Sequence, residues 1–132
     1  IQSLTRITVP CLQHCIPKMT NLINLNAGFL KVEALDPIVT FSALTNLRSL
    51  QLARTKLSEA NWSKLYAVVQ NTLTGLRTFD VTGAAIKPPQ SLFQSMKELR
   101  RLYLSRTDRQ SNDDLLAIAE CPKLHSVYLT NM

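Results

Sequence analysis

Glycine, histidine and charged residues are scarce in this sequence, and each shortage excludes a class of protein. The 132 residues include only 3 glycines and 2 histidines. No G-x-G-x-x-G or G-x-x-x-x-G-K-[ST] segment occurs, so no glycine-rich loop for nucleotide phosphates is expected. Charged residues make up 18% of the chain and hydrophobic residues 45%. This composition excludes an intrinsically disordered chain and supplies enough apolar side chains for a folded core.

Long hydrophobic runs are absent as well. No apolar run approaches the roughly 18 residues of a membrane-spanning helix, and the N-terminal region lacks the features of a secretory signal. The chain starts at Ile1 rather than at a methionine, which indicates a processed product or part of a longer chain. An odd number of cysteines without a secretory signal favours a reducing intracellular compartment, namely the cytoplasm, nucleus or mitochondrion.

The sequence does contain a repeated pattern, L-x-x-L-x-L, in which aliphatic side chains alternate over a short segment. The copies start 25, 29, 23 and 25 residues apart, within or at the edge of the period of 20 to 29 residues known for repeats that each contain one strand. A weaker copy runs from Leu4 to Val9. The first leucines of the five clear copies are Leu22, Leu47, Leu76, Leu99 and Leu124.

This spacing predicts short parallel strands about 4.8 Å apart, with the aliphatic side chains in the core and the intervening side chains outside. The longer segments between them predict helices. Ser58 is positioned to cap a helix that buries Trp62, Leu65, Val68 and Val69. A short helix is expected around Ser91–Met96. Another is expected after Ser111 or Asn112, with Leu115, Leu116, Ile118 and Ala119 on its buried side.

The pattern resembles the leucine-rich repeat family over about residues 20–132. The repeat lengths are similar to the intracellular, ribonuclease-inhibitor-like branch, and Cys121-Pro122 before Leu124 is similar to the cysteine-containing, F-box-associated type. The resemblance implies an α/β solenoid of about five to six repeats, with a curved parallel sheet on the concave side and helices on the convex side. We expect 1–132 to be a single leucine-rich repeat domain, part of a longer chain or array, with 1–21 as an irregular or weak first repeat.

The ninth position of the pattern, where the family usually has asparagine, also predicts specific contacts. Thr55 and Thr107 occupy this position and can each donate one hydrogen bond to the backbone along the stack, whereas Ala84 and Leu30 cannot. We therefore expect the array to be less regular than a consensus one.

Catalytic and metal-binding motifs are not evident. Cys11, His14 and Cys15 are ligand types that zinc uses, but a structural zinc site needs a second pair of ligands, which is missing. A Cys11–Cys15 disulfide stays open as an alternative. Asp113 and Asp114 are best explained as residues at the start of a helix. We expect no enzymatic activity, no catalytic residue, no cofactor and no metal site.

The net charge is +6, from 15 basic and 9 acidic residues. Several of the basic residues fall at equivalent positions of the repeated pattern. Arg48, Arg77 and Arg100 occupy the second position of successive copies, and His125 follows in the next copy. The pattern thus predicts a column of arginines one strand spacing apart along one rim of the sheet. Arginine binds carboxylates and phosphates with two hydrogen bonds and stacks on aromatic rings.

Further candidate residues come from neighbouring positions. Arg54 and Arg106 occupy the eighth position and Arg101 the third, while Tyr103 and Tyr128 share one position in adjacent copies and should be neighbours. Arginine beside tyrosine is typical of protein-binding hot spots and of surfaces that stack nucleic-acid bases. The expected partner-binding residues are Arg48, Gln51, Arg54, Arg77, Asp80, Arg100, Arg101, Tyr103, Arg106 and Tyr128.

The resemblance implies a non-enzymatic scaffold module that binds a protein partner, with an acidic surface, through the strand-lined face. Two alternatives stay open: a component of a ribonucleoprotein or organellar assembly that contacts RNA, and a substrate-receptor part of a ubiquitin ligase. The concave patch would cover only about 300 Å², against about 800 Å² per partner in a standard interface. We therefore expect a subunit of a larger assembly, with adjoining faces or further repeats completing the interface.

Overall fold

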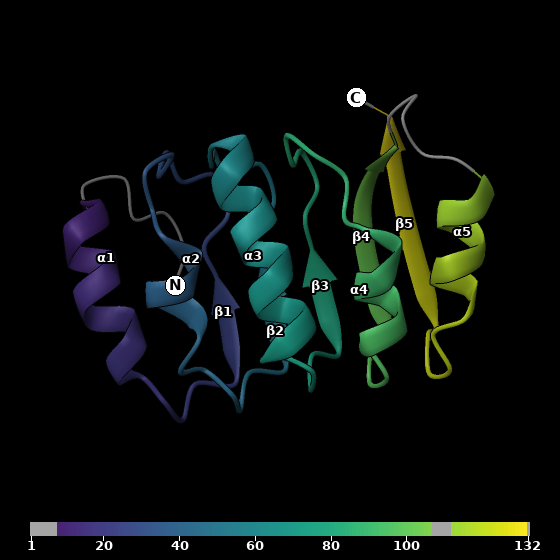
Figure 1. Cartoon of the computed structure of the whole chain (residues 1–132), viewed down its shortest axis with the longest axis horizontal. Helices are drawn as coiled ribbons and strands as arrows, with labels where there is room; N and C mark the ends of the chain where they lie inside the picture. Colours follow the sequence, from purple (N-terminus) through teal and green to yellow (C-terminus); the bar gives the residue numbers. More distant parts are fainter. Residues whose placement is uncertain (1–7, 107–111, 132) are drawn as a thin grey trace.

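The fold is organised around one sheet of five parallel strands whose spatial order, β1-β2-β3-β4-β5, is also their order in the chain (Figure 1). The computed structural model describes residues 8–106 and 112–131. The fold is therefore α/β, and all five clear copies of the pattern form strands. The strands are β1 Asn24–Asn26, β2 Ser49–Gln51, β3 Thr78–Asp80, β4 Arg101–Arg106 and β5 Ser126–Asn131.

The register of the sheet follows the repeat frame. Leu25 pairs with Leu50, and this row continues through the third, fourth and fifth strands without a slip. A slip of one residue would turn the leucines toward solvent, so burial of this apolar row on β1 to β4 fixes the register. The row consists of Leu25, Leu50, Phe79, Leu102 and Val127.

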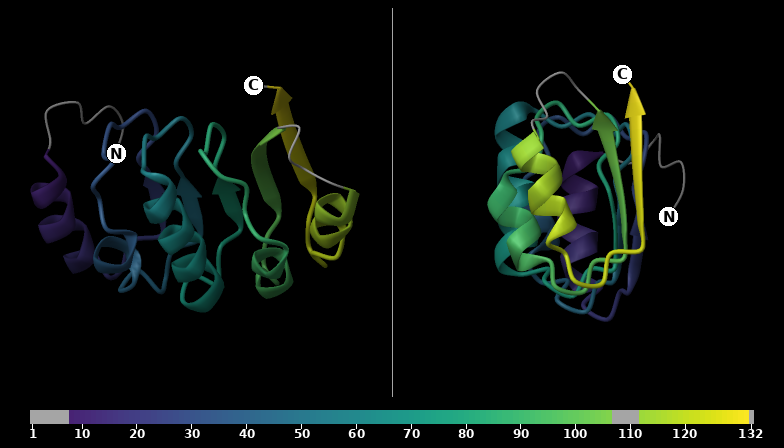
Figure 2. Two further views of the ribbon diagram at one scale, coloured as in Figure 1. Left: turned by 45° about the horizontal axis from the view of Figure 1, so that its top comes forward. Right: turned by 90° about the vertical axis from the view of Figure 1, so that its right-hand side faces the viewer.

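The described helices lie on one side of the sheet, and no described helix or strand covers its other side (Figure 2). We call the uncovered side the open face. Parallel neighbours need a crossover connection, and here each crossover returns over the same side. The helices are α1 Val9–Cys15, the 3₁₀ helix η1 Ile16–Lys18, α2 Pro37–Phe41, α3 Glu59–Asn71, α4 Gln90–Ser95 and α5 Asn112–Ala119.

Helix α3 confirms the prediction made from its capping residue and its apolar spacing. The Ser58 side-chain oxygen accepts a hydrogen bond from the Asn61 backbone nitrogen at 3.2 Å. The four apolar residues predicted to be buried are buried. Tyr66 is buried beside them, and its hydroxyl donates a 2.7 Å hydrogen bond to the Ile86 carbonyl. Burial raises the pKa of the Tyr66 hydroxyl.

Helix α5 forms as predicted but buries a different face. Leu115 and Leu116 were expected in the core, yet they are 44% and 63% exposed, and Ala119 is also exposed. Ile118 is buried as predicted, and Asp114 and Ala117 are buried with it; this face has helical i, i+3, i+4 spacing. Asp114 is more than a helix-start residue, because its carboxylate accepts from Lys87 Nζ at 2.9 Å and from Gln90 Nε2 at 3.2 Å. The predicted cap at Ser111 lies outside the described residues.

Of the weaker copy near the N-terminus, only Thr8 and Val9 are described, so the strand that it predicted is not tested. Val9, the last aliphatic position of that copy, is the first residue of α1. The cause is local, since the Thr8 side chain accepts a hydrogen bond from the Cys11 nitrogen and Pro10 occupies the first turn. The rest of that copy, residues 4–7, lies outside the described residues.

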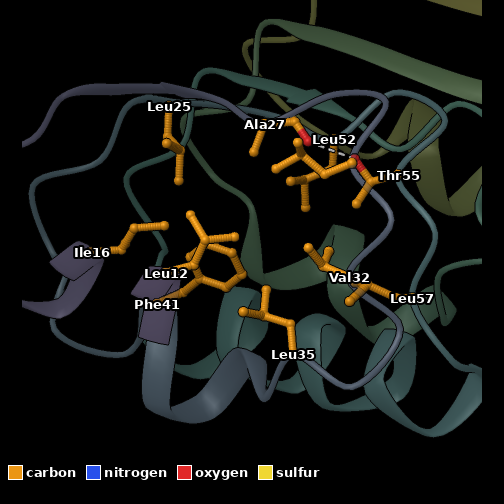
Figure 3. A pocket seen from close by; sticks show the side chains of 11 residues that line it. Leu12, Ile16, Leu25, Ala27, Val32, Leu35, Phe41, Leu52, Thr55 and Leu57 are labelled. Carbon is orange, nitrogen blue, oxygen red and sulfur yellow. Dashed lines mark hydrogen bonds between the residues drawn. The ribbon is translucent and has the colours of Figure 1, made fainter. Parts of the chain in front are cut away.

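A small apolar space lies between the N-terminal helices and the first strands, lined by the side chains drawn in Figure 3. Leu12 and Ile16, from α1 and η1, pack there with Leu25, and the space left between the side chains is about 10 Å³. This volume is at the lower limit for a single water molecule, and its lining is apolar. The first strand is therefore closed over by helices, and this space is no ligand site.

The predicted hydrogen bond along the stack is confirmed for Thr55. Its buried hydroxyl donates to the Ala27 carbonyl of the preceding copy at 2.7 Å (Figure 3). Thr107, predicted to do the same, lies outside the described residues. Among the described helices, none combines the length and the apolar character that crossing a bilayer requires.

Candidate functional site

Two rows of outward-pointing residues cross the open face, as the repeat frame predicted. They alternate with the buried row, because successive side chains of a strand point to opposite sides of a sheet. The polar composition of both rows changes at β4, where arginine and tyrosine replace smaller side chains. One row contains Asn24, Ser49, Thr78, Arg101 and Ser126, and the other Asn26, Gln51, Asp80, Tyr103 and Tyr128.

The predicted arginine column exists, directly before the strands. The Arg77 nitrogen donates to the Arg48 carbonyl at 2.6 Å, and the Arg100 nitrogen donates to the Arg77 carbonyl at 2.8 Å. The His125 nitrogen continues the series by donating to the Arg100 carbonyl at 2.8 Å. Backbone hydrogen bonds thus hold the three arginines on adjacent chain segments, at the N-terminal ends of the strands.

The three arginines of the column are not equivalent. Arg48 is half-buried, and its guanidinium lies over Gly75, where any side chain would collide with it. Arg77 and Arg100 are exposed, and so is Arg101 on the open face. None of these last three forms an ion pair with another described residue. We call Arg77, Arg100 and Arg101 the basic patch.

One carboxylate borders the basic patch and is already engaged. Glu98 forms an ion pair with Lys123, with 2.8 Å between the Lys123 nitrogen and a Glu98 oxygen. The hydrogen bond from Lys123 lowers the pKa of Glu98 most, followed by the charge of Lys123 and then those of Arg77 and Arg100. The three arginines of the basic patch and Lys123 are four cations against this one carboxylate. The patch therefore keeps a local excess of positive charge.

Tyr103 and Tyr128 are neighbours, as their shared position predicted. Their rings stack nearly parallel, with centroids 4.4 Å apart and 6° between the planes. Tyr128 is 48% exposed and Tyr103 is half-buried. Because Arg101 and Tyr103 are two residues apart on β4, their side chains leave the same side of the sheet. The stack and Arg101 of the basic patch therefore share the open face, on the last two strands of the sheet.

Asp80 and Gln51, also predicted as partner-binding residues, make local contacts on the open face. The Asp80 carboxylate accepts a 3.0 Å hydrogen bond from the Thr82 nitrogen, and Asn26 makes the same contact with Gly28 at 3.2 Å. Such contacts stabilise the turn that follows a strand. Gln51 donates to the Ser49 hydroxyl at 3.3 Å.

Arg54 lies away from the basic patch, at the opposite end of the strands. It is six residues beyond Arg48, or about 20 Å along an extended chain, in a turn where its φ is 55°. There it lines a shallow groove of about 380 Å³ together with Glu33, Lys56 and Trp62. Arg106 ends strand β4, and its side chain lies outside the described residues. The predicted arginines are thus divided between the N-terminal and the C-terminal ends of the strands.

Strand β5 exposes side chains of the kind that interior strands bury. Val127 and Leu129 are 40% and 41% exposed, whereas the matching Leu102 and Leu104 on β4 are 0% and 1% exposed. Strand β5 is the last strand of the sheet, so no further strand among the described residues packs beside it. Leu115 and Leu116 of α5 are exposed as well and were missed, because helical spacing alone does not reveal which face has a neighbour.

The described residues contain no group of three or more histidine, cysteine, aspartate or glutamate side chains arranged to hold a metal ion. His125 is exposed in the arginine column, as expected for a rim residue. The cysteines are free; Cys11 and Cys15 are exposed and Cys121 is buried.

Comparison with known proteins gave no match to any family model, curated protein or solved structure.

Proposed function

We propose that the chain is a non-enzymatic protein-interaction module of the leucine-rich repeat type, which binds a partner with an acidic surface through the open face. The single observation that carries the proposal is the Tyr103–Tyr128 stack beside the basic patch. Aromatic and arginine side chains dominate binding energies at protein interfaces. The patch offers arginines without ion pairs to described residues, next to two preoriented rings.

The repeat reading supports the same proposal. Five strands in chain order, an unbroken apolar row and one-sided helices are what a leucine-rich repeat solenoid requires. On this reading the open face is the concave face, and about five repeats form the array. Proteins of this architecture present their extended sheet face to partners.

The partner or a neighbouring subunit would extend from the tyrosine stack over β5. The face alone is smaller than a standard interface, and β5 presents Val127 and Leu129 next to Tyr128. Covering these residues would add apolar area to a contact that otherwise depends on arginine and tyrosine. This contiguity supports membership in a larger assembly. The three free cysteines support a reducing intracellular compartment for it.

Charge reversal on the basic patch tests the proposal. The probe is a fluorescent polyglutamate peptide, and the variant is Arg77→Glu with Arg100→Glu. We expect affinity to fall at least tenfold while the circular dichroism spectrum is unchanged. Lys64→Glu is the matched control, because Lys64 is an exposed cation on α3, on the helix side of the sheet. Unchanged affinity in the double variant, or an equal loss per charge in the control, would refute the site.

RNA is the second candidate partner, and the tyrosine stack favours it. Stacked aromatic rings beside arginine suit unpaired bases and phosphates. On this reading, a fluorescent oligouridine binds more tightly than polyglutamate of equal charge. Its log affinity should fall with log salt with a slope of about −0.7 per phosphate contact. A flat salt profile, or no preference for oligouridine, would remove this candidate.

A further inference from the structure

The two cysteines of helix α1 form a pair on the surface of the molecule. Cys11 and Cys15 are one helical turn apart, both are exposed, and their Sγ atoms are 3.9 Å apart. The helix cannot rotate freely, because Leu12 and Ile16 are buried in the core next to β1. The fold thus holds two thiols side by side in solvent.

Two neighbouring thiols can form a disulfide or bind one metal ion together. The distance between the sulfur atoms distinguishes these two reactions. A disulfide needs an S–S length of about 2.05 Å and Cβ atoms about 3.8 Å apart, whereas residues one turn apart on a helix have Cβ atoms about 5 to 6 Å apart. Closing the bond would therefore distort α1. Two thiolates on one tetrahedral Zn²⁺, each about 2.3 Å from the metal, lie about 3.8 Å apart. The observed 3.9 Å suits a shared ion with the helix intact.

We propose that Cys11 and Cys15 form a two-sulfur binding site for a thiophilic divalent metal ion of the Zn²⁺ type. Binding replaces the two thiol protons by two sulfur–metal bonds and releases two H⁺, so it needs no oxidant. The chain supplies two ligands, and water or a partner's side chain completes the coordination. The site lies on α1, away from the basic patch, and does not depend on the proposed interaction function.

The same helix face carries two further residues that bear on the site. His14 Nε2 lies 3.1 Å from Lys18 Nζ. This contact engages the imidazole with the Lys18 side chain. Within α1 there is no aspartate or glutamate that would compete as a hard ligand or repel the sulfur anions.

Cys121 provides an internal control. Its thiol is buried, and its Sγ lies 3.5 Å from the Phe93 carbonyl oxygen. Burial raises the pKa of Cys121, with a smaller opposing effect of Lys97. Because Cys121 is buried whereas Cys11 and Cys15 are exposed, a metal ion that binds the pair from solvent should not involve Cys121.

The test is titration of the reduced 132-residue chain with Cd²⁺, which reports through ultraviolet sulfur-to-metal charge-transfer absorbance, followed by competition with Zn²⁺. We expect one Cd²⁺ per chain, displaced by Zn²⁺. Affinity should fall at least tenfold in Cys11→Ser and in Cys15→Ser, and should be unchanged in Cys121→Ser. Circular dichroism establishes that each variant is folded. Absence of the band in the folded chain, a normal band in the Cys11→Ser/Cys15→Ser variant, or one ion per two chains would overturn the proposal.

Discussion

The rings of Tyr103 and Tyr128, from two adjacent parallel strands, stack with centroids 4.4 Å apart and planes 6° apart. The residues are 25 positions apart in the sequence, and only the strand register brings them together. Because the outer ring is about half exposed, the pair adds little to the core. Its position beside the basic patch makes it the centre of the proposed interface.

The stack allows a comparison between two substitutions at one position. Tyr128→Phe keeps the ring and should leave the free energy of unfolding within about 0.5 kcal/mol of the parent, since it removes only an exposed hydroxyl. Tyr128→Ala loses the stack, worth about 0.5 to 1.5 kcal/mol, and should also weaken binding. Urea unfolding and the near-ultraviolet circular dichroism of the tyrosines measure both effects. Equal stability and equal tyrosine signal in the two variants would contradict a stacked pair.

The exposed last strand predicts unequal costs at matched positions. Leu102→Ala on β4 should lower the free energy of unfolding by about 2 to 5 kcal/mol, because it leaves a cavity at a fully buried site. Val127→Ala in the next strand should cost below about 1 kcal/mol, because this side chain is already 40% exposed. Urea titration of both variants checks the difference. Similar losses would mean that β5 is covered in solution.

The Glu98–Lys123 pair predicts a dependence on pH. The folded-state pKa of Glu98 is lower than its unfolded value, so the stabilisation is present above the unfolded pKa and is lost as pH falls through the folded pKa. Lys123→Met removes the largest cause and should move the Glu98 pKa upward toward its ordinary range. An NMR titration of the Glu98 side chain measures it at low salt, since exposed pairs are screened. If the Glu98 pKa is the same in the variant as in the parent, Arg77 and Arg100 rather than Lys123 would be the main cause of its low value.

The hydrogen bond from Thr55 to Ala27 predicts the effect of an isosteric change. Thr55→Val keeps the shape but removes the donor to a part-buried carbonyl. The free energy of unfolding should fall by about 1 to 3 kcal/mol, because a buried acceptor is left unpaired. Thr72→Val is a control at a part-exposed threonine whose side chain has no such bond to a neighbouring copy. Chemical unfolding measures the loss of unfolding free energy in the two variants. Equal losses would argue against the hydrogen bond from Thr55 to Ala27.

The sequence predicted the strands well because their signal is periodic and local. Five copies of L-x-x-L-x-L located the strands, their parallel order and their register, and Ser58 located the start of α3. The weak copy ending at Val9 lies mostly outside the described residues, and Val9 itself begins α1 after a threonine cap, with a proline in the first turn. The adjacency of Tyr103 and Tyr128 followed from the frame, but the near-parallel stacking of their rings did not.

What the sequence determined by itself is the repeat: which residues point into the core, which point out, and which arginines share a column. Tertiary structure decided which of these residues are available. Arg48 folds over Gly75, Arg54 lies at the far end of the strands, and α5 turns Leu115 and Leu116 to solvent. The physical reason is that periodicity fixes the direction of a side chain relative to its own strand or helix. Exposure depends on neighbours from other copies, which no local pattern encodes.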